Sequence, residues 1–294
     1  MALITVITPT YNRAARLEEL FQSLCCQTSR NFEWLVVDDG STDDTAQMVQ
    51  EMTGKAGFPV RYIYKENGGK HTALNVGIRE INTELTFIVD SDDAVLPHGI
   101  ELIEAYYQKY KDDDSIGVWA FLKQTRSRGI ILRMPEDEYV GDYIEERIHK
   151  RRPGDMAEVF RTQALREFPF PEFPGERFLS EDVVWIPLAM KYRSVFINKA
   201  IYLFEYLPDG LTNNDKVLKF ASPLGSMMRG KMLMKKECGM LSRVRGAIIY
   251  TCYKKEVIDA ITPCVELTHW CDKFMAALLA PLGAYYYKKW KNRQ

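Results

Sequence analysis

The sequence predicts an α/β protein built on a mostly parallel sheet. Over the first 125 residues, short β-branched and apolar runs alternate with segments whose apolar residues recur at helical spacing. Repeated strand–helix–strand units of this kind put helices on both faces of a parallel sheet. A length of 294 residues with 46% hydrophobic content provides a sizeable core. One large domain or two small ones are therefore expected.

The elements follow in a definite order. Strands are expected at 3–8, 32–37, 60–64, 85–89, 116–122, 195–197 and 201–206. Helices are expected at 13–27, from about residue 44 onward, and at 70–81, 100–110 and 180–192. Residues 126–178 are less regular and richer in proline and charge. After Leu211 the chain becomes basic, methionine-rich and helical, which predicts a body over 1–212 and a helical extension over 213–294.

The charge is distributed unevenly. Residues 219–294 hold 14 Lys and Arg against five Asp and Glu, a net charge of +9, so the first 218 residues carry −10 of the overall −1. A nucleic-acid binder usually carries its basic residues in the site itself, so this class is disfavoured. An acidic body suits metal binding, and a basic tail suits an anionic surface.

The cysteines and the N-terminus favour a cytoplasmic protein. None of the six cysteines forms a CxxC pair, and no Cys and His set has zinc spacing. They are therefore interpreted as free thiols in a reducing compartment. The chain opens on a strand without the features of a signal peptide, and no window reaches the ~20 apolar residues that a membrane span needs.

Acidic residues follow two of the expected strands. A buried strand ends at Asp90-Ser91-Asp92-Asp93, and ligands of parallel sheets bind beyond the strand C-termini. Clustered carboxylates repel one another unless a cation or protons neutralise them, and Mg²⁺ or Mn²⁺ prefers oxygen ligands. The alternative is a polar turn before the next helix. The second cluster, residues 38–43, offers a carboxylate to a nucleobase or ribose, or else forms a turn and helix cap.

A glycine-rich turn and a late acidic pair complete the candidates. Asn67-Gly68-Gly69-Lys70-His71 precedes a helix and suits phosphate, although the pattern is not a P-loop. The alternative is a left-handed turn with a solvated lysine. Glu181 and Asp182 open a later helix, where a carboxylate serves as a general base or complements the helix dipole. The first strand lacks a following GxGxxG, which disfavours a dinucleotide site.

The order and spacing of these motifs resemble family 2 glycosyltransferases, the inverting group with the GT-A fold. The resemblance covers about residues 1–210 and is carried by an ordered set of short motifs. These are Val6-Ile7-Thr8-Pro9-Thr10-Tyr11-Asn12, Gln27-Thr28, Phe32-Glu33, Val37-Asp38-Asp39-Gly40-Ser41-Thr42-Asp43, Asn67-Gly68-Gly69, Asn75-Val76-Gly77, Asp90-Ser91-Asp92-Asp93 and Glu181-Asp182.

The resemblance implies a role for each matching position. It implies a nucleotide-sugar-binding half over 1–125 and an acceptor-binding half over 126–212. In the substrate-binding set, Thr8, Tyr11 and Asp39 contact the uridine, Lys70 lies near the base or phosphates, Asp90 faces the ribose, and Glu181 adjoins the base. Asp92 binds Mn²⁺ or Mg²⁺ with help from Asp93, and Asp182 is the general base.

The expected activity is transfer of a sugar from a nucleoside-diphosphate donor to a hydroxyl of a glycan or lipid-linked acceptor in cell-surface glycan synthesis. UDP is the favoured donor nucleotide. Two alternatives are a sugar nucleotidyltransferase and a catalytically silent nucleotide-binding scaffold. The apolar run 274–287 is too short to span a bilayer but long enough to lie in an interface beside the basic residues 288–293. The alternative is a helix packed on the body or in a homodimer.

Overall fold

The structure is a computed structural model that describes residues 2–152, 154–205, 215–257 and 262–291. The chain forms two compact units. The first, here called the sheet unit, comprises Met1–Tyr143, Arg152–Pro169 and Lys191–Glu205; the second, the helical unit, comprises Ile144–Arg151, Phe170–Met190 and Tyr206–Gln294. The boundary expected at residue 212 lies outside the described residues. Residues 170–190, expected in the acceptor half, belong to the helical unit.

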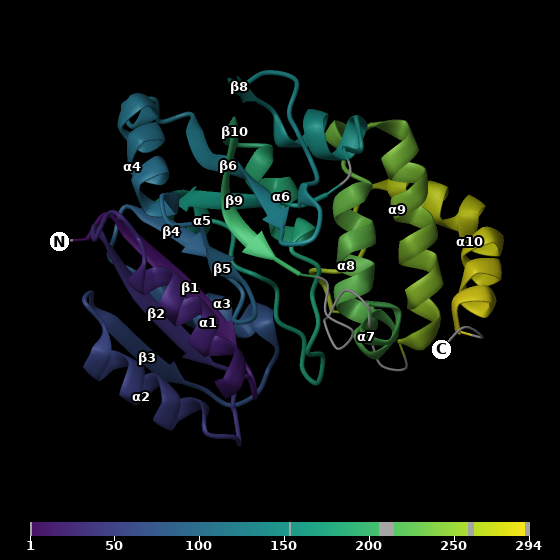
Figure 1. Cartoon of the computed structure of the whole chain (residues 1–294). Coiled ribbons are helices and arrows are strands. Elements are labelled where there is room, and N and C mark those ends of the chain that lie inside the picture. Colours follow the sequence, from purple (N-terminus) through teal and green to yellow (C-terminus); the bar gives the residue numbers. More distant parts are fainter. Residues whose placement is uncertain (1, 153, 206–214, 258–261, 292–294) are drawn as a thin grey trace. The chain divides into compact units, whose positions relative to one another are not determined.

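The N-terminal part of the sheet is parallel (Figure 1). Its strands β1 (Ile4–Thr10), β2 (Phe32–Asp38), β3 (Val60–Tyr64) and β4 (Leu85–Ile88) pair in the order β3-β2-β1-β4. The register sets Thr10 opposite Asp38, so the first two strands end together. The apolar runs therefore deliver their polar C-terminal neighbours to a single edge of the sheet, as expected.

The rest of the sheet is mixed. Strand β9 (Met156–Arg161) lies antiparallel between β4 and β6 (Ile116–Thr125), and β10 (Arg193–Phe204) is parallel to β6. The shorter strands β5 (Ala94–Val95) and β8 (Glu138–Gly141) pair with β10, and β7 (Gly129–Ile130) pairs with β6. The two late strands expected at 195–197 and 201–206 are one strand, interrupted by register shifts around Ala200.

Helices cover both faces of the parallel strands, which confirms the α/β class. They are α1 (Ala14–Cys25), α2 (Thr45–Lys55), α3 (Lys70–Glu80), α4 (Gly99–Tyr110) and α5 (Thr162–Arg166). Helix α1 packs its buried face into the core that contains Val6 and Trp34. On α3, a Cβ at Gly77 would collide with Ile7 and lie 2.9 Å from Val37 Cγ2. Because side chains alternate along a strand, α1 and α3 lie on opposite faces.

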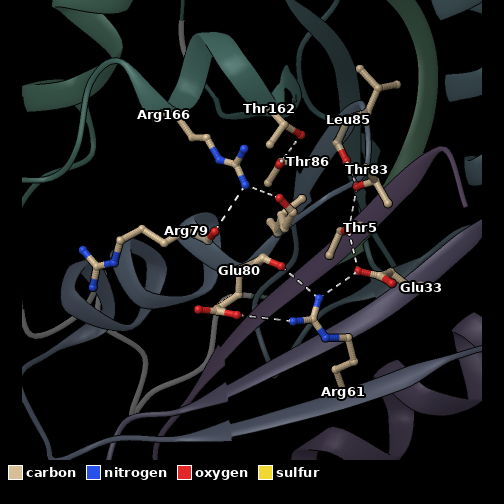
Figure 2. Close-up of polar contacts among 11 residues, drawn as sticks. Thr5, Glu33, Arg61, Arg79, Glu80, Thr83, Leu85, Thr86, Thr162 and Arg166 are labelled. Carbon is tan, nitrogen blue, oxygen red and sulfur yellow. Dashed lines mark hydrogen bonds and ion pairs between the residues drawn. The ribbon is translucent and has the colours of Figure 1, made fainter. Parts of the chain in front are cut away.

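At the N-terminal ends of the parallel strands, the polar side chains bond to one another and to nearby backbone carbonyls (Figure 2). The Thr5 hydroxyl contacts the Glu33 carboxylate at 2.9 Å and Thr83 Oγ1 at 2.7 Å, and Arg61 bonds Glu33 and the carbonyl of Glu80. Arg166 donates to carbonyls at the C-terminal end of α3, where helix acceptors are otherwise unsatisfied. A substrate site is therefore expected at the other end of the strands, where their C-termini lie.

The helical unit contains the remaining long helices. It comprises α6 (Asp182–Ala189), α7 (Asp215–Ala221), α8 (Pro223–Leu233), α9 (Gly239–Tyr253), α10 (Trp270–Lys291) and the short turns η1 (Ile144–His149), η2 (Lys236–Cys238) and η3 (Lys254–Glu256). Helices α8 and α9 touch at Gly230 and Gly246, where a Cβ on Gly230 would lie 2.7 Å from the Gly246 carbonyl oxygen. Among the described helices, none is both long and apolar enough to cross a membrane.

Candidate donor and acceptor sites

The loop after β1 is tied to the loop after β2. Asn12 adopts a left-handed backbone with φ of 50°, accepts from the Thr42 amide at 2.8 Å, and donates its own amide to Ser41 Oγ at 2.8 Å. Asparagine tolerates this conformation better than most residues. The arrangement holds Tyr11 at the edge, with its side chain 45% exposed.

The two threonines that end β1 differ in their availability to a ligand. Thr8 is fully buried, and its hydroxyl accepts from Trp34 Nε1 at 3.0 Å. Thr10 lies two residues further along the same strand face, and its buried hydroxyl has no hydrogen-bond partner among the described residues. A buried polar atom of this kind is uncommon, and an absent ligand is one explanation. Sequence reasoning selected Thr8 and did not consider the unpartnered hydroxyl of Thr10.

Asp39 anchors the glycine-rich turn. Its carboxylate accepts from Lys65 Nζ at 2.7 Å, from the Gly68 amide at 2.9 Å and from the Gly69 amide at 2.6 Å. The turn needs glycine because Gly69 has φ of 97°, and Gly40 has φ of 85° with Asn67 N only 2.7 Å from where a Cβ would lie. The amides expected to suit phosphate therefore bind the protein's own carboxylate at the start of α3.

Lys70 links this turn to the end of β4. It is the first residue of α3, and its Nζ lies 2.6 Å from Asp90 Oδ1. Burial acts to raise the pKa of Asp90, but the positive charges of Lys70, Lys123 and Arg13 outweigh it and lower the pKa below its ordinary value. Asp39, the turn, Lys70 and Asp90 thus form a continuous series of contacts from β2 to β4.

The other two aspartates of this cluster have different partners. Asp92 pairs with Arg13 Nη1 at 2.9 Å, and Asp93 accepts from the hydroxyl of Tyr202 at 2.7 Å. Burial, followed by the charge of Asp90, raises the pKa of Asp93 to about 7. Tyr202 comes from β10 and also accepts from the Asp90 amide at 3.0 Å, so it fixes both ends of the acidic turn.

The acidic turn supplies the oxygen ligands that Mg²⁺ and Mn²⁺ prefer. Over the described ranges, however, no group of three or more His, Cys, Asp or Glu residues is arranged to hold an ion. Arg13 and Lys70 meanwhile supply countercharge to Asp92 and Asp90. The residues therefore fit an ion that takes one or two carboxylates and completes its coordination with substrate phosphates and water.

The candidate base lies in the helical unit. Asp182 opens α6, and its Oδ2 accepts from Arg229 Nε of α8 at 2.7 Å. Its Oδ1 is buried and has no hydrogen-bond partner within the described part of the chain. Glu181 is half-buried as the residue before α6, and its carbonyl accepts from the Trp185 amide. Arg229 thus provides countercharge to the Asp182 carboxylate through one of its two oxygens.

Sequence reasoning missed most of the partners of the acidic residues. They are Arg13, Lys65, Lys123, Tyr202 and Arg229. Arg13 directly follows the first-strand motif, and this position was the only feature of the sequence that could have identified it as a partner. Lys123 lies 4.3 Å from the Tyr202 ring centroid, a cation–π contact between two separate strands that no sequence pattern indicates.

The sheet topology, with acidic residues beyond the C-terminal ends of its strands, is that of an α/β protein of the GT-A type. The chain belongs to glycosyl transferase family 2, because the model of that family matches residues 5–169. Glycosyltransferase GlyG of Streptococcus pneumoniae is 26% identical over 78% of this chain and 79% of its own length. Poly(ribitol-phosphate) beta-N-acetylglucosaminyltransferase TarS of Staphylococcus aureus is 33% identical over 69% of this chain, which spans 35% of TarS.

Solved structures agree on the fold. TarS residues 1–349 of S. aureus in complex with UDP-GlcNAc has a TM-score of 0.63 at 21% identity, covering 87% of this chain and 72% of that one. A mannosyltransferase from Pyrobaculum calidifontis with GDP-Man and Mn²⁺ has a TM-score of 0.58 at 19% identity, covering 99% and 83%. The protein is a glycosyltransferase of family 2, which disfavours both the nucleotidyltransferase and the silent-scaffold alternatives.

Proposed function

We propose that the protein is an inverting, metal-dependent glycosyltransferase that transfers a sugar from a UDP donor to a hydroxyl of a cell-surface glycan or its lipid-linked precursor. The observation that carries the donor assignment is the series of contacts from Asp39 through the turn and Lys70 to Asp90. It joins the two acidic strand ends across one edge of the sheet, where ligands of such sheets bind. The UDP-GlcNAc held by a TarS structure supports UDP as the donor nucleotide.

The donor site is assigned to the sheet unit. Exposed Tyr11 stacks on the uracil, Asp39 and the strand end at Thr8 and Thr10 contact the nucleoside, and Asp90 accepts from the ribose. Lys70 exchanges its contact with Asp90 for the donor phosphates. The buried Thr10 hydroxyl and Asn67 Oδ1, both without hydrogen-bond partners among the described residues, gain partners when the nucleotide binds.

The reaction requires one base and one displacement. The Asp182 carboxylate takes the proton of the acceptor hydroxyl while the hydroxyl oxygen bonds to the anomeric carbon. The bond from that carbon to the diphosphate oxygen breaks, and the diphosphate leaves with the electron pair. Asp92 and Asp93 would hold a Mn²⁺ or Mg²⁺ ion, which would supply positive charge to the leaving diphosphate. Attack from the face opposite the leaving group inverts the configuration.

A panel of nucleotide sugars tests the proposal. The full chain is incubated with each donor, a glycan acceptor and Mn²⁺ or Mg²⁺, and released diphosphate and the anomeric configuration of the product are measured. We expect UDP release with a UDP-sugar and a product of inverted configuration. Release of a different nucleotide would refute the donor, a retained configuration would refute the mechanism, and full turnover in EDTA would refute the metal requirement.

A further inference from the structure

One face of α10 is docked on α9. Asp272 pairs with Arg243 of α9 at 3.2 Å near one end of the contact, and Lys291 pairs at 2.7 Å with Glu256 of η3, which directly follows α9. Between them, Gly283 lies so close to Thr251 that an added Cβ would collide with the threonine side chain, and Ala276 is buried. These contacts fix which side of the helix faces the protein.

The other face of α10 is an apolar stripe. It consists of five exposed residues spaced four, four, four and three apart, which places them on one side of a helix. They are Trp270, Phe274, Leu278, Leu282 and Tyr285, with exposed fractions of 75, 64, 67, 40 and 55%. At 1.5 Å per residue the apolar stripe is roughly 23 Å long. Scattered exposed apolar residues need no explanation, but a continuous row of this length does.

The exposed charges that α10 itself places beside the apolar stripe are positive. Lys273 is exposed near its beginning, and Lys288 and Lys289 are exposed just beyond its end. Lys289 Nζ lies 5.7 Å from the ring centroid of Tyr285. The acidic residue of α10, Asp272, forms an ion pair with Arg243 on the side that faces α9. Any surface that covers the apolar stripe therefore meets an apolar centre with lysines at both ends.

We propose that the apolar stripe binds the surface of an anionic lipid bilayer, with α10 lying in the interface and its lysines among the headgroups. Tryptophan and tyrosine favour this region, and amphipathic helices rich in lysine lie within it. A second copy of the chain fits less well. Whether two stripes pair parallel or antiparallel, lysines at the end of one face lysines at an end of the other. An anionic leaflet complements the same charges.

This binding surface is independent of the donor and acceptor assignments, because it uses residues of α10 alone. A peripheral contact of this kind would raise the concentration of a lipid-linked acceptor near the enzyme. It would also add no residue to the reaction itself. The surface can therefore be tested by binding alone, whether or not the proposed chemistry holds.

Vesicle sedimentation of the full chain tests the proposal. The probes are phosphatidylcholine vesicles with and without phosphatidylglycerol, at low and high salt. We expect binding to the anionic vesicles that weakens with salt. Leu278→Gln should weaken it about tenfold, because an apolar side chain leaves the interface. Lys288→Gln with Lys289→Gln should weaken binding to anionic vesicles about 30-fold at low salt.

Val217→Gln is the matched control. Val217 is 52% exposed on α7, outside the apolar stripe, so this variant should bind as the wild type does. Circular dichroism and UDP affinity verify that every variant is folded. Equal sedimentation with anionic and neutral vesicles at low salt would overturn the proposal. So would a dimer in solution that Leu278→Gln dissociates without any vesicle binding, which would assign the apolar stripe to a second copy.

Discussion

The carboxylates of the two units differ in how completely their oxygens are paired. In the sheet unit Asp39, Asp90, Asp92 and Asp93 each have a hydrogen-bond or ion-pair partner. In the helical unit Asp182 has a partner for one oxygen, and the other oxygen is buried without one. The first arrangement favours exchange of partners with a ligand, and the second leaves one carboxylate oxygen without a partner among the described residues. The difference separates residues that bind and position from the residue proposed to react.

The largest expected effect comes from Asp182. Asp182→Asn keeps the size of the side chain and removes its basicity, so turnover should fall ~10²-fold or more while UDP affinity changes little. Steady-state kinetics and calorimetry measure the two quantities. Glu181→Gln is the control beside it. If Asp182→Asn keeps near-normal turnover and Glu181→Gln loses it, the base is Glu181.

A substitution at Gly40 should disturb the turn that Asp39 anchors by straining its backbone. Gly40→Ala combines a left-handed φ of 85° with a close approach to Asn67 N, so the turn must move. We expect a loss of ~1–2 kcal/mol in stability from the backbone alone, with weaker UDP binding in addition. Gly129→Ala is the matched control, because Gly129 also has a positive φ, 67°, but a Cβ there would meet no other atom within 4 Å.

Thermal unfolding and calorimetry of the two glycine variants separate strain from collision. Gly129→Ala should lose stability through strain only and should bind UDP normally. If both variants bind UDP equally well, the turn that Asp39 anchors has no part in donor binding.

The metal requirement is tested at Asp92. Asp92→Asn should weaken UDP binding about tenfold in the presence of Mn²⁺, because the ion loses a ligand. EDTA should weaken wild-type binding to a similar level, because it removes the ion itself. EDTA should have little further effect on the variant. Wild-type affinity that is unchanged by EDTA in calorimetry would argue that Arg13 and Lys70, rather than a metal, neutralise this edge.

The smallest expected effect concerns the hydroxyl of Tyr202. Tyr202→Phe leaves the ring in the core and removes one donor to Asp93 and one acceptor for the Asp90 amide. The free energy of unfolding should fall by ~1–2 kcal/mol, as expected for unsatisfied buried groups. Denaturant unfolding measures this change. A variant as stable as the wild type would show that the acidic turn does not depend on this contact.

The sequence predicted the parallel half of the fold because its signals are local. Apolar runs and helical spacing located β1 to β4 and α1 to α4 within a few residues, and the GT-A class is confirmed. Strand β9 was missed, because its six residues lie in a charged, irregular region without alternation. The interruption around Ala200 made one strand resemble two.

The acidic residues could be located from sequence, but their partners could not. Asp39, Asp90 and Asp92 follow apolar runs that end at one sheet edge, which is a local property. The contacts of Asp90 with Tyr202 and of Asp182 with Arg229 join residues 112 and 47 positions apart. Only the tertiary arrangement determines such pairs, so the partners of each carboxylate remained beyond sequence reasoning. Their assigned roles stay predictions.

Strand β9 has a consequence for how the chain is synthesised. It is the strand that joins β4 to β6, yet it is made only after both of them. While residues 156–161 are still absent, the parallel half exposes β4 as an open edge, and open edges pair with other chains. In the nascent chain β4 therefore lacks its second neighbour until β9 has been made.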